Sequence, residues 1–515
     1  MIARVESYTL FGLEGVPVTV EADISKGIPS FDMVGLPDAA VKESRERVKS
    51  AMKNSGLTFP NHKITVNYAP AYVKKEGSAL DLATAISLLK GEGALEANAN
   101  GIIFLGELAL NGELRPVRGV LPAVISAREK GYKTFIVPAD NGKEAGYVGG
   151  VNVYAARTLR EVVDHLSGHA PLIPVRCDGF EAAHKPKSEN DKRELSAHDL
   201  SFVKGQEIAK RALEVAVAGG HNILLVGPPG SGKTMLARAI PTVLPDLSFD
   251  EALEITKIHS VAGMLGENGI IAERPFRTPH HTATTVSLCG GGNKTVHPGE
   301  ISLAHGGVLF LDELPEYKRS TLEALRQPLE DGVITISRSG GTVTYPASFM
   351  LCASMNPCPC GNYGSSTRQC TCTPSEIKRY RARISGPLLD RIDIQVEVDG
   401  VTYDDLSGGE SGETSAEIKE RTDRARRIQR ERYAGENVNT NSEMSEKDIR
   451  KYCALSKECD DILREAFTSL RLSARARSRI LKVARTIADL ATEENILPEH
   501  VMEAVSYRTY GAEEE

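Results

Sequence analysis

The sequence has no run of about 18–20 apolar residues, the length that an α-helix needs to cross a bilayer. Its first stretch, MIARVESYTLFGLEGVPV, has no basic region followed by a long apolar one, so it does not resemble a signal peptide. A large net charge is also absent, since 62 Lys and Arg against 69 Asp and Glu leave −7. This balance does not indicate a nucleic-acid-binding protein, although a local basic stripe can act inside an acidic chain. We expect a cytoplasmic protein without a membrane partner.

Convincing repeats and extended low-complexity tracts are missing as well. Hydrophobic residues make up 41% of the chain and charged residues 25%, an ordinary globular composition that excludes a wholly disordered or fibrous chain. The nine cysteines favour thiols or metal ligands over a disulfide scaffold in a cytoplasmic protein. At about 100–200 residues per domain, 515 residues predict about three domains.

Changes in composition divide the chain. The apolar runs NILLV, GVLFL and SFMLCA suit parallel strands buried on both faces, and the helical stretches between them indicate βαβ units. The residues from Cys177 to Asp199 are polar and almost free of large apolar side chains, which is typical of a linker. The predicted parts are an α+β unit over 1–170, a linker over 171–199, an α/β core over 200–400, a linker and basic helix over 401–442, and a helical region over 443–510.

The strongest motif is GPPGSGKT, which matches the phosphate-loop pattern GxxxxGK[ST] between a predicted strand and a predicted helix. Such a loop lets backbone N–H groups converge on phosphate oxygens at a helix N-terminus. We expect Lys233 to reach the β and γ phosphates and Thr234 to hold Mg²⁺, so ATP and Mg²⁺ are the expected cofactors. The alternative is a chance glycine-rich turn. The predicted nucleotide-binding residues are Gly227, Pro228, Pro229, Gly230, Ser231, Gly232, Lys233 and Thr234.

Polar residues follow two later apolar runs. Asp312 and Glu313 end the run GVLFL, at a strand end that would face the ligand crevice. Asp312 is the expected Mg²⁺ carboxylate, and Glu313 the residue that orients or deprotonates the attacking water. Asn356 follows the next run and could contact the γ-phosphate or position the water. The alternatives are an acidic strand cap and a turn-forming Asn before proline.

Two arginines follow these motifs in the chain. Arg391 precedes another strand-like run, and Arg475 begins a C-terminal helix. An arginine that neutralises transition-state charge can be supplied to a neighbour's nucleotide. Catalysis divided between subunits in this way implies a closed head-to-tail ring. The alternative for any single arginine is a solvated surface side chain.

Four cysteines form the pattern CxC–x9–CxC: Cys358, Cys360, Cys370 and Cys372. Four thiolates can complete a closed tetrahedral zinc site with a structural role. The spacing is tighter than the usual CxxC knuckle, so four free thiols remain the alternative.

The chain resembles the magnesium-chelatase-like AAA+ ATPases of the YifB/ComM family. The resemblance runs nearly end to end, through VGLPDAAVKESRERVKSA, GPPGSGKT, RPFRTPHHTAT, GVLFLDEL, NPCPCG, SGPLLDRIDI and LSARARSRILKVARTIADL. It implies an AAA+ P-loop core with a helical lid, and a segment containing Val203 and Gln206 against the adenine. It also implies Asn356 as sensor 1, Arg391 as arginine finger and Arg475 as sensor 2.

The resemblance further implies a hexamer that acts as a branch-migration helicase in recombination or natural transformation. Related helicases carry a pore hairpin where DGVITISRSGGTVTYP predicts a turn between two strands. Arg338 near its tip and Arg277 in a second insert are therefore candidate contacts for single-stranded or branched DNA. Ordinary surface hairpins are the alternative. Residues 1–170 resemble a Lon-protease-like (S5 domain 2-like) domain, but Ala79 stands at the expected nucleophile position, so we expect no proteolysis.

Two other functions compete with the DNA motor. One is a chelatase-type subunit that remodels a protein partner or drives metal insertion. The other is a binding protein that uses ATP only as an assembly switch.

Overall fold

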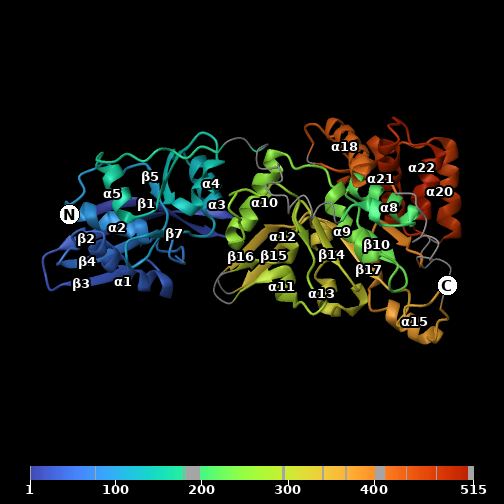
Figure 1. Cartoon of the computed structure of the whole chain (residues 1–515), viewed down its shortest axis with the longest axis horizontal. Coiled ribbons are helices and arrows are strands. Elements are labelled where there is room, and N and C mark those ends of the chain that lie inside the picture. Colours follow the sequence, from blue (N-terminus) through green and yellow to red (C-terminus); the bar gives the residue numbers. More distant parts are fainter. Residues whose placement is uncertain are drawn as a thin grey trace.

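Three regions follow one another along the long axis of the molecule (Figure 1). The computed structural model describes residues 2–75, 77–177, 180, 198–292, 296–338, 341–365, 368–400, 412–436, 438–470 and 472–508. Most of the linker predicted over 171–199, and residues 401–411 of the second predicted linker, lie outside these residues. Among the described helices, none is both long and apolar enough to cross a membrane.

The N-terminal region is built on a seven-stranded mixed sheet. Buried and less buried positions alternate along its second strand, where Val18, Val20 and Ala22 are buried, as expected of a strand with one face on the core. In sheet order the strands are β3 (Ser30–Val34), β4 (Lys63–Ala69), β2 (Glu14–Ser25), β1 (Ile2–Phe11), β5 (Ile102–Phe104), β8 (Thr134–Pro138) and β9 (Asn152–Ala156).

Helices complete this region. The first of them begins after Asp38, whose carboxylate accepts a hydrogen bond from the backbone N–H of Val41 at 2.8 Å and so caps the helix. The helices and the short strands are α1 (Ala39–Asn54), α2 (Asp81–Gly91), β6 (Glu107–Leu108), β7 (Leu114–Arg115), α3 (Val120–Glu129), α4 (Gly142–Gly146) and α5 (Leu159–Leu166).

The central region is a five-stranded sheet in which all pairs are parallel. Every residue of its three central strands is buried, which explains their continuous apolar runs. The sheet order is β11 (Phe276–Arg277), β14 (Val308–Leu311), β17 (Met350–Met355), β10 (Ile223–Val226) and β18 (Ile394–Glu397). Because β17 lies between β10 and β14, residues that follow these three strands meet at one edge of the sheet.

Helices and insertions surround this sheet. They are α8 (Glu207–Gly219), α9 (Lys233–Val243), α10 (Phe249–Ala262), α11 (Thr285–Cys289), α12 (Glu300–Leu303), α13 (Arg319–Glu323), α14 (Pro328–Asp331), α15 (Pro374–Arg381), α16 (Gly386–Leu389) and the strand pair β12 (Gly290–Gly291) and β13 (His297–Pro298). The hairpin expected over 331–346 is present as the antiparallel pair β15 (Val333–Arg338) and β16 (Gly341–Pro346). Its turn, residues 339–340, lies outside the described part.

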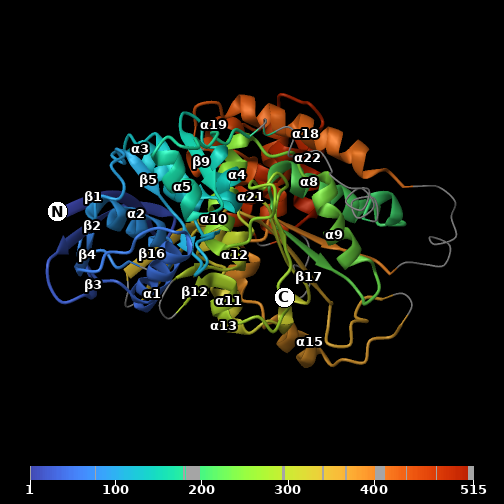
Figure 2. The same cartoon turned by 60° about the vertical axis from the view of Figure 1, so that its left-hand side comes forward.

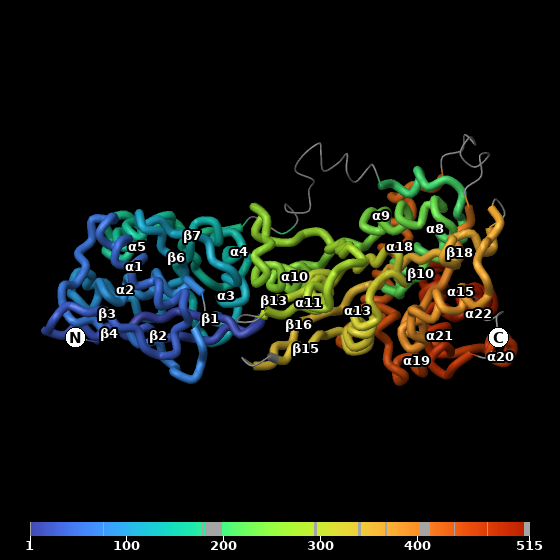
Figure 3. The backbone as a smooth tube through the Cα atoms, turned by 90° about the horizontal axis from the view of Figure 1, so that it is seen from below, coloured from blue at the N-terminus to red at the C-terminus, as the bar shows by residue number. Residues whose placement is uncertain are grey.

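This hairpin, β15–β16, lies on the side of the core that faces the N-terminal region (Figure 3). A Cβ added at Gly12 would lie 2.5 Å from a methyl group of Val343, and one at Gly341 2.8 Å from the ring of Phe11. Nearby, the Ser260 hydroxyl of α10 donates a hydrogen bond of 2.6 Å to Glu144 of the N-terminal region. The two regions are therefore in direct contact, as Figure 2 shows from another side.

The C-terminal helices pack on the opposite end of the core, where α18 contacts α8 and α9 and α21 contacts α8. They are α18 (Ser415–Arg432), α19 (Glu446–Tyr452), α20 (Lys457–Ser469), α21 (Ala474–Leu490) and α22 (Pro498–Ser506). The basic helix α18 uses several arginines internally: Arg421 pairs with Glu214, and Arg426 donates to the Val217 carbonyl at 3.0 Å. These contacts favour a structural role for this helix over DNA binding.

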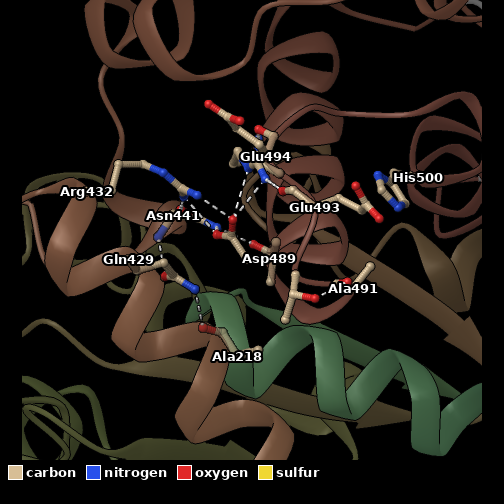
Figure 4. Close-up of polar contacts among 12 residues, drawn as sticks. Ala218, Gln429, Arg432, Asn441, Asp489, Ala491, Glu493, Glu494 and His500 are labelled. Carbon is tan, nitrogen blue, oxygen red and sulfur yellow. Dashed lines mark hydrogen bonds and ion pairs between the residues drawn. The ribbon is translucent and has the colours of Figure 1, made fainter.

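A buried carboxylate holds α18 to α21 (Figure 4). Asp489, at 0% exposure, accepts hydrogen bonds from Arg432 at 2.8 Å, Arg485 at 3.1 Å and Asn441 at 2.8 Å. Beside it, Gln429 of α18 donates to the Ala218 carbonyl of α8 at 2.9 Å. The charge is thus paired on several sides, which is the condition under which a buried ion pair can be tolerated.

Replacing Asp489 with alanine is expected to destabilise the folded protein by about 3–5 kcal/mol, because two arginines lose their buried partner. Denaturant unfolding followed by circular dichroism measures this change. The control is Asp460→Ala, which removes a surface ion pair with Arg464 at 3.0 Å in α20 and should cost about 0.5 kcal/mol or less. Equal shifts for the two variants would contradict the role given to Asp489.

Candidate nucleotide-binding site

The glycine-rich loop 227–232 connects β10 to the first residue of α9. Gly230 and Gly232 have φ angles of 80° and 90°, and a Cβ added at either would meet nothing within 4 Å. These left-handed conformations favour glycine, and both residues face open space above the N-terminus of α9. The loop therefore offers backbone N–H groups and the positive end of a helix dipole to an anion.

Lys233 lies inside this loop, and only 8% of its surface is exposed. Its ammonium donates to the carbonyl oxygens of Gly227 at 2.6 Å and Pro228 at 2.8 Å, and lies 3.4 Å from the Asn356 amide oxygen. Burial lowers the pKa of Lys233 to about 8, against the opposing effect of Asp312 and Glu313. A polyphosphate beside this ammonium would favour its charged form.

The carboxylate of Asp312 meets the hydroxyl of Thr234, whose Oγ1 donates to Asp312 Oδ2 at 3.1 Å. Hydroxyl and carboxylate oxygens are ligands that Mg²⁺ accepts, so this pair fits the predicted metal position. The Ser354 hydroxyl, on the adjacent strand β17, donates to the other oxygen of Asp312. The sequence reasoning missed Ser354. It stands two residues before Asn356, near the end of β17.

Glu313 has a φ of 53°, an unusual left-handed conformation for a residue with a side chain. Its side chain is 55% exposed, and His281 Nδ1 lies 3.7 Å from its carboxylate. The rings of His280 and His281 are 4.1 Å apart, and the Tyr317 hydroxyl donates to the Pro279 carbonyl at 2.5 Å. The insert after β11 thus folds back onto the acidic pair, a contact that sequence reasoning did not anticipate for His281.

The segment before α8 reaches the same edge. Gln206, with a φ of 64°, donates through its amide to the Asp399 carbonyl at 2.7 Å. The preceding residue, Val398, approaches Gly227 so closely that a Cβ there would lie 2.2 Å from the Val398 carbonyl oxygen. Val203 is buried in the core cluster beneath. Gln206 is therefore connected to the phosphate loop through residues 398–399. Contact of Val203 and Gln206 with adenine stays a prediction.

The two predicted catalytic arginines lie elsewhere. Arg391 is buried, pairs with Glu330 and donates to the Pro387 carbonyl at 2.7 Å. Its own carbonyl accepts a hydrogen bond of 3.0 Å from Asn222, the residue before β10, which places it at the amino end of the strands. Arg475 is exposed. The hydrogen bond from Arg391 holds the pKa of Glu330 below its usual value, and the charges of Arg391 and Arg475 act in the same direction.

The phosphate loop thus lies at the carboxyl end of the parallel strands, and Arg391 lies at their amino end. A strand of the four residues of β10 spans about 13 Å at ~3.3 Å per residue. The structure brings Lys233, Thr234, Asp312, Glu313 and Asn356 together, but it does not bring Arg391 or Arg475 to the Lys233 of the same chain.

The remaining candidates differ in their surroundings. Arg277, in β11, donates two hydrogen bonds to Glu300 at 2.6 and 2.9 Å. Arg338 ends β15, and its side chain lies outside the described part.

The sulfur atoms of Cys358, Cys360, Cys370 and Cys372 all lie within 4.8 Å of one another. The sequence spacing thus correctly indicated that the two CxC pairs meet.

The fold and the site define a P-loop nucleoside-triphosphate-binding protein with an AAA+-type parallel sheet. Family models described as magnesium chelatase, subunit ChlI, match residues 20–141 and 199–406, and a model of the ChlI C-terminal part matches residues 412–508. The chain belongs to the magnesium-chelatase-like family that includes YifB and ComM. This confirms the resemblance stated from the sequence.

Two curated relatives match over almost their whole length. The uncharacterized protein YifB of Escherichia coli is 45% identical over 98% of this chain and 97% of its own length. The competence protein ComM of Haemophilus influenzae is 43% identical over the same shares of both chains. Lon protease 2 of Bacillus subtilis is 26% identical over 131 residues, 25% of this chain and 23% of that protein. The last match is partial, and the predicted domain boundaries and helical lid stay predictions.

Proposed function

We propose that this chain hydrolyses ATP with Mg²⁺ at sites shared between neighbouring copies in a closed hexameric ring. The observation that carries the proposal is the separation of the phosphate loop from Arg391 and Arg475 across the sheet. A head-to-tail contact would bring the amino edge of one copy to the nucleotide of the next, and such a heterologous contact closes into a ring when its rotation permits.

Each residue then has a defined role. The loop amides and Lys233 bind the phosphates, while Thr234 and Asp312 would hold Mg²⁺. When bound, Mg²⁺ would neutralise charge on the phosphate oxygens. Glu313 orients a water molecule and accepts its proton, and Asn356 positions that water beside the γ-phosphate. Arg391 and Arg475 reach the next copy's nucleotide, where they stabilise the charge of the transition state.

The proposed output of this hydrolysis is movement on single-stranded or branched DNA in the cytoplasm, as in branch migration during recombination or natural transformation. A relative that matches almost end to end carries the name competence protein. The hairpin β15–β16 offers Arg338 at the end of a strand. Arg277 is already paired with Glu300, and Arg338 is the residue proposed for a phosphate contact.

DNA binding and its effect on turnover test this output. Forked DNA is expected to bind, to raise ATP turnover several-fold over linear duplex, and to lose affinity steeply between about 50 and 200 mM salt. Arg338→Ala should weaken binding and reduce the salt slope by about 1, whereas Arg464→Ala on the distant helix α20 should change neither. Active ATPase without DNA binding at low salt would contradict the DNA-motor proposal.

A chelatase-type subunit is the second candidate, favoured by the three family models that match the chain. Such a protein would use the same ATPase ring to remodel a protein partner or drive metal insertion. ATP turnover that responds to a protein partner and ignores DNA would support it.

The four-cysteine loop is proposed as a structural zinc site. The sulfur atoms are 3.4 Å apart for Cys358–Cys360, 3.7 Å for Cys358–Cys370 and 3.6 Å for Cys360–Cys370. A tetrahedral zinc with bonds of about 2.3 Å to sulfur requires separations of ~3.8 Å. The four thiols therefore fit one zinc ion and leave no position for a reactive water.

A further inference from the structure

The four-cysteine loop, residues 357–373, lies directly against the phosphate loop. Gly361 has a φ of 81°, and a Cβ added to it would lie 2.5 Å from Pro229 Cδ. Only a residue without a side chain fits this approach. The neighbouring thiol of Cys358 is fully buried, and its sulfur accepts a hydrogen bond from the Tyr363 backbone N–H at 3.3 Å. The backbone N–H of Gly361 donates to the Cys358 carbonyl at 3.0 Å, so one turn joins this cysteine to the glycine that meets Pro229.

The same loop connects two parts of the nucleotide site. It begins immediately after Asn356, whose amide oxygen faces Lys233. It ends at Thr373, which caps α15 by accepting a hydrogen bond from the Glu376 backbone N–H. Arg381 of α15 reaches back and donates to the Pro357 carbonyl at 3.2 Å. The hydrogen bond from Arg381 therefore ties α15, which follows the loop, to Pro357, the residue next to Asn356.

The four-cysteine loop is irregular. Its described residues form no helix or strand before α15, and a loop of this length normally needs another constraint to hold one conformation. Four unligated thiols this close to one another gain little from their contact, whereas a bound metal would fix both CxC pairs at one point. Closing a loop with a metal removes conformational entropy from the free segment.

We propose that metal binding at the four cysteines organises the phosphate loop, so that nucleotide affinity depends on zinc. The metal makes no contact with nucleotide. It fixes the loop, the loop presses Gly361 against Pro229, and this contact holds the phosphate loop in its binding conformation. The inference rests on the proposed zinc site and on the proposed ATPase, and it adds regulation of that ATPase by metal supply.

The first test removes ligands from the full-length protein. Purified wild type is expected to contain about one zinc per chain by elemental analysis, with no iron. The double variant Cys370→Ser/Cys372→Ser should lose this zinc and bind a fluorescent ATP analogue about tenfold more weakly, comparable to the effect of removing a supporting contact at a metal site. The control Cys177→Ser/Cys289→Ser removes two cysteines outside the cluster and should keep both zinc and affinity.

The second test separates the contact from the metal. Gly361→Ala and Gly364→Ala both place alanine at a left-handed φ, 81° and 75°, in the same loop, but an added Cβ at Gly364 meets nothing within 4 Å. Both variants should retain zinc, and only Gly361→Ala should bind the analogue about tenfold more weakly.

The outcomes distinguish the two proposals. A wild type without zinc, or one that contains iron instead, overturns the zinc site. Loss of zinc with unchanged nucleotide affinity, or equal effects of the two glycine variants, overturns the coupling to the phosphate loop. Zinc-dependent nucleotide binding in a wild type that hydrolyses no ATP supports the coupling and contradicts only the ATPase function.

Discussion

Replacing Glu313 with glutamine is expected to reduce ATP turnover about a thousandfold while ATP still binds within about twofold of the wild-type affinity. The carboxylate belongs to the residue after β14 and Asp312, not to the phosphate loop, and it lies 3.7 Å from His281. Loss of a positioned general base typically costs about 10²–10⁴ in rate. The measurement is steady-state phosphate release together with equilibrium binding of an ATP analogue.

Two further variants serve as controls for this result. Lys233→Ala removes the ammonium inside the loop and should abolish both binding and hydrolysis. Glu316→Gln changes a carboxylate of the same segment that pairs with Arg383 at 2.8 Å, and it should leave turnover within about twofold. Undiminished turnover in Glu313→Gln would contradict the role of Glu313, and undiminished turnover in Lys233→Ala would refute the nucleotide site itself.

Much of this site could be predicted from sequence because each part is local. Apolar runs identified the strands β10, β14 and β17, and polar residues directly after them marked the site edge. Ser354 was missed because its partner Asp312 belongs to another strand, and the lateral order of strands is not written in either segment. His281 was missed because its contact with Glu313 depends on how a whole insert folds back.

The arginines show the opposite limit. Their roles as arginine finger and sensor 2 stay predictions. The structure pairs Arg391 with Glu330, and Arg479 of α21, one helical turn after Arg475, donates to the Arg391 carbonyl at 3.1 Å. Sequence spacing could not reveal that Arg391 lies at the amino end of the strands. Its place depends on how the chain runs from β17 through α15 to β18. The same holds for the approach of Gly361 to Pro229.

Replacing Arg391 with alanine is expected to reduce ATP turnover about a thousandfold, as loss of an arginine supplied in trans does. Because Arg391 is buried and paired with Glu330, Arg475→Ala serves as a second, exposed variant with the same direction of effect. Thermal unfolding of each variant checks that the fold is retained.

Mixing inactive variants then tests whether sites are shared. Lys233→Ala supplies an intact arginine and Arg391→Ala an intact phosphate loop, so random assembly in a ring creates one complete site in about a quarter of the interfaces (1/2 × 1/2). Turnover near a quarter of wild type is expected from an equimolar mixture of two proteins that are inactive alone. A mixture as inactive as its components, or a wild type that hydrolyses ATP at full rate as a monomer, would contradict the shared site, because Arg391 would then have no nucleotide within reach.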